Sequence, residues 1–266
     1  MELGLNNKVA LVTGASKGIG KAIAEALAAE GARVAITART GSEVEQVADQ
    51  LRKAGHDAIA ITADVTNPQD VDRAVIDVAA KFGTIHVLVN NAGGVGSFAP
   101  FDQLSDRDWL SVFELNVMSA VRVTRAVLPY MQRQKWGRII NISSESATQP
   151  DAAMPHYNAS KAALNNLTKS LSKAYARDGI LANTVSPAFI MTPLLEGFMS
   201  TLAQQTGLSR EQAISDFMAE NRPHIEMGRP GRSEEVASAV VFLASENASF
   251  ITGTNVRVDG GSVASV

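Results

Sequence analysis

The segment VALVT (Val9–Thr13) runs directly into GASKGIG (residues 14–20), and a helix-length segment rich in alanine follows. The strand-like segment is apolar or β-branched throughout, which is typical of a strand covered on both faces. Glycines in the turn permit positive φ, and they let backbone N–H groups approach a pyrophosphate at the positive end of the helix. The pattern predicts a strand–turn–helix unit that binds a dinucleotide, and the alternative is a tight turn without a ligand.

Further segments have the same buried-strand character, at residues 33–37, 58–62, 87–90, 138–143, 181–185 and 255–258. Helix-length segments separate them, with start signals at Ser42 and at Asn67-Pro68. This alternation predicts an α/β fold, a Rossmann-type doubly wound parallel sheet of about seven strands with helices on both faces. No proline- and glycine-rich linker and no internal repeat divides the chain, so we expect residues 1–266 to form a single domain.

One long segment, about 192–231, interrupts the alternation of strands and helices. It contains no strand pattern, only two helical patterns near residues 194–205 and 209–221. A helical excursion after the carboxyl end of a strand is typical of a lid over a binding cleft. The alternative is a peripheral helical hairpin.

Composition and charge exclude several classes of function. The 266 residues include no cysteine, which rules out disulfides, thiolate catalysis and cysteine-bound metal. The 4 histidines are scattered singly, so we expect no metal site. A net charge of −3 gives no basic footprint for nucleic acid, and no apolar stretch is long enough to span a membrane. The first residues lack the pattern of a signal peptide, and we expect a cytoplasmic protein.

The end of the second predicted strand indicates which dinucleotide binds. An acidic residue there hydrogen-bonds the ribose of NAD, whereas arginine accommodates the 2′-phosphate of NADP. The chain has Arg39 at this point, and the next carboxylate is Glu43. Lys17 in the glycine turn adds a second positive charge, and a guanidinium can bind a phosphate through two hydrogen bonds. We therefore expect NADP (NADPH) rather than NAD; the alternative is that Arg39 is a solvated loop residue.

Tyr157 and Lys161 lie four residues apart in a long helical pattern, residues 156–177, and so share one helix face. A free tyrosine has a pKa of about 10, and a neighbouring cation favours the phenolate and lowers that pKa. Ser144 follows a predicted strand and should emerge at the carboxyl edge of the sheet, where ligands bind in this architecture. The combination indicates proton exchange with a substrate oxygen, although a Tyr–Lys pair alone is usually an ordinary exposed pair.

Over essentially its whole length the chain resembles the short-chain dehydrogenase/reductase family. The matching motifs are residues 13–20, Asp64-Val65, residues 90–93, Asn116, Ser144, Tyr157-x-x-x-Lys161, and Pro187 with Thr192. The resemblance implies that Tyr157 is the general acid/base and that Ser144 orients the substrate oxygen. It also implies that Lys161 binds the nicotinamide ribose and lowers the tyrosine pKa, and that Asn116 holds a water in a proton relay.

The same resemblance assigns a set of residues to the cofactor. They are Gly14, Ser16, Lys17, Gly18, Ile19, Gly20, Arg39, Asp64, Val65, Asn91, Ala92, Gly93, Tyr157, Lys161, Pro187, Ile190 and Thr192. Asp64 and Val65 would flank the adenine, and Thr192 would contact the carboxamide. Ala188 departs from the family, which commonly has glycine after the proline, and the departure puts the local backbone geometry beside the nicotinamide in doubt.

The function that the resemblance implies is NADPH-dependent reduction of a small-molecule ketone to an alcohol, as in 3-oxoacyl-thioester reductases. The nearest alternative is an NAD(P)-linked alcohol, sugar or diol dehydrogenase acting oxidatively. A non-catalytic dinucleotide-sensing scaffold is the alternative of another class, but the presence of Ser144, Tyr157 and Lys161 favours an enzyme. Candidates for a patch that docks an acyl carrier are Arg122, Arg125 and Arg133. The resemblance further implies a homo-oligomer, a tetramer or dimer, built partly by helices around residues 109–133 and 156–177.

Overall fold

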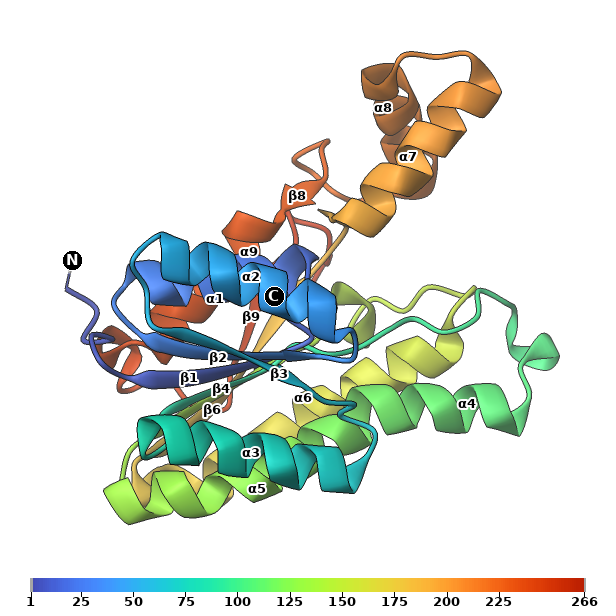
Figure 1. Ribbon diagram of the computed structural model, residues 1–266. Coiled ribbons are helices and arrows are strands. Elements are labelled where there is room, and N and C mark those ends of the chain that lie inside the picture. Colours follow the sequence, from blue (N-terminus) through green and yellow to red (C-terminus); the bar gives the residue numbers. More distant parts are fainter. Residues whose placement is uncertain (1, 266) are drawn as a thin grey trace.

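The computed structural model describes residues 2–265 and shows helices on either side of a central sheet (Figure 1). The sheet has 7 parallel strands in the order β3-β2-β1-β4-β5-β6-β9. The strands are β1 Val9–Thr13, β2 Arg33–Ala38, β3 Ala58–Thr62, β4 Val87–Asn90, β5 Gly137–Ile142, β6 Ile180–Pro187 and β9 Asn255–Val258. The predicted fold class is confirmed, and every predicted strand is present with small differences at its ends.

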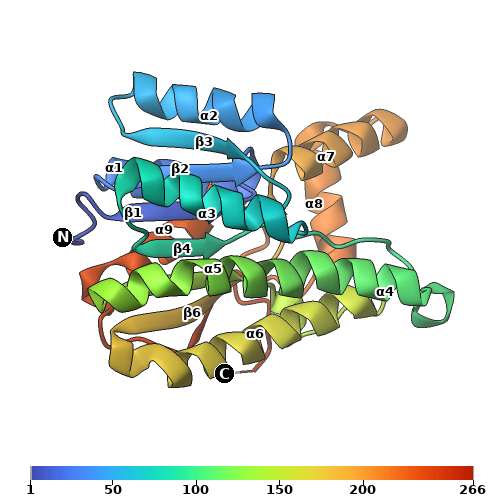
Figure 2. The same ribbon diagram turned by 60° about the horizontal axis from the view of Figure 1, so that its bottom comes forward.

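Helices cover both faces of the sheet (Figures 1 and 2). One face carries α1 Gly18–Ala29, α2 Gly41–Lys53 and α9 Ser233–Ala244; the other carries α3 Pro68–Phe82, α5 Ser119–Gln134 and α6 Pro155–Tyr175. Helix α4, Asp106–Phe113, continues into α5 through one π-helical turn, Glu114–Met118. Short 3₁₀ turns are η1 Phe101–Gln103, η3 Glu145–Ala147, η4 Ala176–Asp178 and η5 Glu246–Ala248.

The central strand β1 explains why the strand segments are continuously apolar. Its residues Ala10 and Val12 pack into the core on the α1 side, while Val9 and Leu11 pack into the core on the α3 side. Both faces are therefore buried. Because the strand order changes direction between β1 and β4, the carboxyl ends of these strands border the crevice where folds of this type bind ligands.

The predicted helix starts are confirmed at one position and wrong at another. Asn67 begins α3 as predicted, since its side-chain oxygen accepts hydrogen bonds from the N–H groups of Gln69 and Asp70 at 2.9 and 3.4 Å. Ser42 does not begin α2, which starts at Gly41 without a side-chain cap. Gly41 packs so closely on Thr62 that a Cβ would lie 2.7 Å from the Thr62 hydroxyl, so this first helical position has no room for a side chain.

The excursion is a helical hairpin that stands away from the sheet (Figure 1). Its helices are α7 Pro193–Thr206 and α8 Arg210–Asn221, close to the predicted positions. The short strands β7 Ile190–Met191 and β8 Gly231–Arg232 pair at its base, and they are too short to leave a hydrophobic period in the sequence. The hairpin has its own small core, which includes Met199 and Met218. Among the described residues, no helix has the length and apolar character needed to cross a membrane.

His86 fastens β1 at the amino edge of the sheet, away from the crevice. The Val9 N–H donates to its Nδ1 at 3.0 Å, and its ring meets Trp136 edge-on at 5.8 Å between centroids. Burial lowers the pKa of His86 to about 4, and the charges of Lys8 and Arg33 act in the same direction. The histidine is therefore neutral in the folded protein at neutral pH.

The lowered pKa of His86 predicts that protonation of this residue reduces the stability of the protein in acid. The folded pKa lies below the unfolded value of about 6.5, so the unfolded chain binds more protons and stability falls as the pH drops from about 6.5 to about 4. After discounting for partial exposure, we expect the wild type to lose about 1–2 kcal/mol more over this interval than His86→Gln. Urea unfolding across that pH range measures the difference, and parallel curves for the two proteins would contradict the assignment.

Candidate active site

Asn91 closes the glycine-rich turn against the end of β4. Its Nδ2 donates to the carbonyl oxygens of Thr13 and Gly14 at 2.9 and 3.0 Å. A Cβ on Gly20 would collide with this amide nitrogen, and a Cβ on Gly14 would lie 2.8 Å from the Cα of Ala92. Gly14 also has a positive φ of 64°. The turn therefore requires glycine at both positions.

The amino end of α1 opens beside this turn. Lys17 precedes the helix in an extended conformation and its side chain makes no capping hydrogen bond. The first N–H groups of a helix have no partner within the helix, and together with the helix dipole they attract an anion. The position is suited to a pyrophosphate.

A groove of about 310 Å³ runs from the turn across the carboxyl ends of β2, β3 and β4. It is lined by Gly14, Ser16, Lys17, Thr37, Ala38, Arg39, Thr40, Glu43, Ala63, Asp64, Val65, Ala92, Gly93 and Leu115. The structure thus brings together the residues predicted for the adenine and phosphate end of the cofactor. The open helix end, the glycines of the turn and the nearby cations fit a dinucleotide.

Charges in the groove are partly balanced. Lys17 Nζ lies 3.8 Å from the carboxylate of Glu43, a groove residue that was not predicted as one. Burial alone would raise the pKa of Asp64, but hydrogen bonds from the Thr66 N–H and hydroxyl at 2.9 and 2.7 Å, with the charge of Arg39, hold it below its ordinary value. Arg39 is exposed and has no carboxylate partner within 4.0 Å among the described residues.

The remaining predicted cofactor residues lie outside this groove. Thr192 is adjacent to the turn, because a Cβ on Gly18 would lie 3.3 Å from its methyl carbon. Ile19 packs against the core on the α1 side, and Pro187 is buried at the end of β6. Ile190 lines a different cavity, described below.

Ser144, Tyr157 and Lys161 meet at the carboxyl end of β5. Lys161 is 4% exposed, and its Nζ donates to the Ile142 carbonyl at 2.8 Å and lies 5.6 Å from the centroid of the Tyr157 ring. The Ser143 hydroxyl donates to the Lys161 carbonyl at 3.1 Å, which holds α6 against the strand. The predicted grouping of the three side chains is present in the structure.

The expectation that Lys161 lowers the tyrosine pKa stays a prediction, because Lys161 is not among the causes that shift this pKa in the protein alone. Burial raises the pKa of Tyr157 above its ordinary value; a hydrogen bond with Ser144 opposes this, and the charge of Glu145 adds to it. Burial also lowers the pKa of Lys161 to about 8, because the ammonium has lost its hydration. Burial is the largest cause of the shift for both groups, and the phenol stays protonated at neutral pH.

Asn116 lies in the π-helical turn and holds the loop after β4. Its Oδ1 accepts from the Gly94 N–H, and its Nδ2 donates to the Gly94 carbonyl and to the Ser160 hydroxyl, each at 2.9 Å. Ser160 in turn donates to the Tyr157 carbonyl at 2.7 Å. Both amide hydrogens are used within the protein, so the expected water relay would have to use other atoms of this residue.

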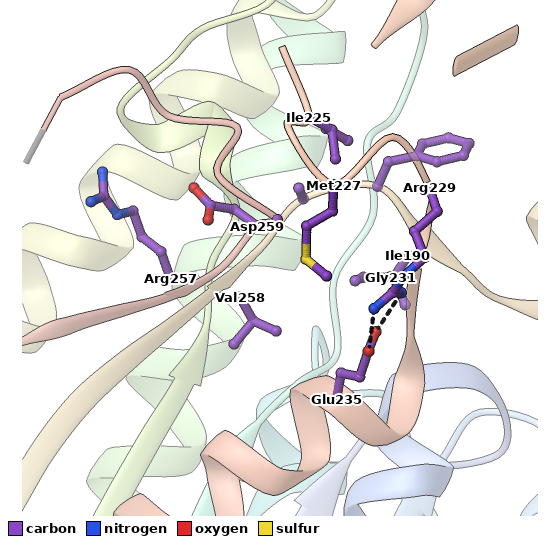
Figure 3. A pocket seen from close by; sticks show the side chains of 12 residues that line it. Ile190, Ile225, Met227, Arg229, Gly231, Glu235, Arg257, Val258 and Asp259 are labelled. Atoms are coloured by element: carbon purple, nitrogen blue, oxygen red, sulfur yellow. Dashed lines mark hydrogen bonds and ion pairs between the residues drawn. The ribbon is translucent and has the colours of Figure 1, made fainter. Parts of the chain in front are cut away.

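A second cavity of about 250 Å³ lies behind β7 and is lined by Ile190, Met227, Glu235 and Asp259 among others (Figure 3). Arg229 donates to the Glu235 carboxylate at 2.7 and 3.1 Å, as the dashed lines in Figure 3 show. These hydrogen bonds, above all, lower the pKa of Glu235 to about 2. This ion pair occupies both of these side chains; Asp259 and Arg257 also line the cavity. Ala188 also lines it and packs against the small core of the hairpin.

The family sequence model described as short chain dehydrogenase matches residues 8–203. The chain belongs to the short-chain dehydrogenase family. It is an oxidoreductase, and its fold is one that binds a nicotinamide dinucleotide. No cluster of His, Asp or Glu that could hold a metal ion occurs within residues 2–265.

Relatives match along the whole molecule. The chain is 37% identical to the oxidoreductase YvaG of Bacillus subtilis over 266 residues, which is 100% of both proteins. It is 37% identical over 259 residues to the 3-oxoacyl-[acyl-carrier-protein] reductase FabG of Vibrio cholerae, covering 97% of this chain and 98% of FabG. The L-sorbose reductase of Gluconobacter frateurii, solved with NADPH and L-sorbose, superimposes with a TM-score of 0.95 at 36% identity, covering 100% of both chains.

Gly93 offers a test of the site geometry that removes no reactive group. A Cβ on Gly93 would lie 2.9 Å from Asn116 Oδ1 and 3.3 Å from Lys161 Nζ. We expect Gly93→Ala to lower kcat by about 10–100-fold, because small displacements of reacting groups are costly. In the control Gly94→Ala the added methyl group would meet only a methyl carbon of Leu115 at 3.2 Å, and a flexible side chain can move. Steady-state kinetics of both variants measures this, and equal rates would show that the contact is unimportant.

Proposed function

We propose that this short-chain dehydrogenase reduces a ketone to a secondary alcohol with NADPH, with Tyr157 as the general acid. The observation that carries the proposal is the meeting of Tyr157, Ser144 and Lys161 at the carboxyl edge of the sheet, beside the dinucleotide groove. When bound, NADPH supplies hydride to the carbonyl carbon.

The preference for NADPH rests on charge at the end of β2. Arg39 lines the groove without a carboxylate partner among the described residues, and no acid occupies the position where one would hold the ribose of NAD. The acid that does line the groove, Glu43, lies next to Lys17, which balances its charge. The L-sorbose reductase solved with NADPH is consistent with this choice.

The state of Tyr157 suits reduction. Its raised pKa keeps the proton on the phenol at neutral pH, ready for transfer to an oxygen that becomes an alkoxide as the carbonyl is reduced. Ser144 interacts with the same phenol, so its hydroxyl is placed to stabilise that oxygen. Lys161 and Asn116 hold the surrounding backbone through Ile142 and Gly94.

The position of the excursion supports the proposal that it acts as a lid in this reaction. Thr192 begins α7 and lies against Gly18 of the glycine-rich turn. The base of the hairpin is therefore next to the dinucleotide groove, and movement of α7 and α8 about this base would open or close its entrance.

Removing the phenolic hydroxyl tests the general acid. We expect Tyr157→Phe to lower kcat for ketone reduction by about 10²–10⁴-fold while NADPH affinity changes far less. Tyr175→Phe, at the other end of the same helix, is the matched control and should retain wild-type turnover. Stopped assays of NADPH oxidation and titration of nicotinamide fluorescence measure the two quantities. Full turnover by Tyr157→Phe would show that another group donates the proton.

Reversing the charge of Arg39 tests the cofactor. We expect Arg39→Asp to weaken NADPH binding by about 10–100-fold, the cost of losing a charged hydrogen bond, and to weaken NADH binding much less. The control Arg177→Asp changes the same charge on an exposed residue of η4 and should change neither affinity. Fluorescence titration with both dinucleotides measures this. Tighter wild-type binding of NADH would favour an NAD-linked dehydrogenase instead.

A further inference from the structure

A buried carboxyl group directly follows the proposed substrate-orienting serine in the chain. Glu145 directly follows Ser144 at the carboxyl end of β5 and is 8% exposed. It is the chain neighbour of Ser144, whose side chain hydrogen-bonds the Tyr157 phenol, and its charge is one of the causes that raise the pKa of that phenol. Glutamate is almost never this buried unless its oxygens have partners.

The carboxyl group of Glu145 has room for more hydrogen bonds than it makes. Within residues 2–265 its only side-chain donor is the Ser262 hydroxyl, which contacts Oε2. A carboxylate has about four acceptor positions on its two oxygens. The other oxygen, Oε1, is not among the fully buried polar side-chain atoms that lack a hydrogen-bond partner. Acceptor capacity therefore remains on Oε1.

Nearby cations do not use that capacity. The charges of Arg222 and His224 lower the pKa of Glu145, but burial outweighs them and its pKa is raised. Arg222 is paired with Asp151 at 3.2 Å instead. Asp259 adds a second negative charge in the vicinity. The surroundings of the carboxyl group are thus polar on several sides. If the bound substrate were an apolar chain, the free acceptor positions of this carboxyl group would have no hydrogen-bond partner.

We propose that Glu145 determines substrate specificity by accepting hydrogen bonds from hydroxyl groups next to the carbonyl of a polyhydroxylated ketone. This rests on the proposed ketone reduction and names the substrate class for the same site. A site built to hydrogen-bond a hydroxyl group rejects an analogue without it by up to about 10⁴–10⁵-fold, because the buried polar group then has no partner. An alkyl chain beside Glu145 would bind more weakly for this reason, because it offers the carboxyl group no hydrogen bond.

The arginines predicted as a carrier-docking patch also argue against an acyl carrier as the substrate. Arg122 is bound to Glu114 at 2.6 Å, and the Arg133 guanidinium lies 4.5 Å from the centre of the Tyr130 ring. Both cations already interact with their own helix neighbourhood, which leaves Arg125 as the exposed arginine of the three without such a contact among the described residues. A single exposed arginine is a weak basis for docking an acidic carrier.

The test compares two ketones with the same carbon skeleton, D-fructose and hexan-2-one, using NADPH. We expect the wild type to have a kcat/KM at least about 10-fold higher for D-fructose. Glu145→Leu keeps the bulk and removes the acceptors; it should lower kcat/KM for D-fructose by about 100-fold, mainly through KM, and raise it for hexan-2-one. Glu145→Gln keeps an acceptor for Ser262 and should fall between the two. An unchanged ratio of the two substrates in Glu145→Leu would overturn the proposal.

Ser262→Ala separates recognition from mere packing. It removes the tail contact and retains the carboxylate, so it should change kcat/KM for both ketones in parallel. If it reproduces the change in ratio seen with Glu145→Leu, the glutamate acts only by holding the tail and the proposal fails. Acetoacetyl-CoA separates this failure from that of the proposed function: reduction of acetoacetyl-CoA but not of D-fructose overturns the substrate class alone. Absence of NADPH oxidation with all three ketones would overturn both.

Discussion

The site depends on one contact that only glycine allows. The Asn91 amide reaches the carbonyls of Thr13 and Gly14 because Gly20 has no side chain in its way. Thr13 completes the contact by accepting, through its hydroxyl, from the N–H groups of Asn91 and Ala92 at 3.1 Å each. This joins the ends of β1 and β4 at the point where the strand order reverses. The dinucleotide groove lies on one side of the junction, and on the other Gly93 packs against Asn116 and Lys161.

Burial controls the protons at this junction more than neighbouring charges do. Lys161 is held by a backbone carbonyl rather than by a carboxylate, and it loses part of its basicity. The phenol of Tyr157 gains affinity for its proton in the same low-polarity environment. The polar groups on the opposite edge of the sheet serve stability instead: Trp136 donates to Glu246 at 3.0 Å and lies under the charges of Lys8 and Arg138.

The strands and the glycine turn could be predicted because both follow from local rules, continuous apolar runs and a fixed spacing of glycines. Features that depend on contacts between residues distant in sequence could not be predicted. Gly41, not Ser42, begins α2, at a position where Thr62 leaves no room for a side chain. The tyrosine pKa moved in the unexpected direction because the depth of burial is a property of the fold. Glu145 was missed because a charged residue after a strand is usually solvated, and its partner Ser262 is 117 residues away.

The last residues of the described chain are folded onto the site rather than trailing from it. Asp259 accepts from the N–H groups of Gly261 and Val263 at 3.2 and 3.1 Å, Ser262 contacts Glu145, and Arg257 binds the Ser265 carbonyl. The amino-terminal residues instead run along η5, where the Glu246 N–H donates to the Leu3 carbonyl at 3.0 Å. For protein engineering this makes the two ends unequal. An affinity tag or fusion partner belongs at the amino end, because one attached at the carboxyl end would pull on the loop that follows Ser144.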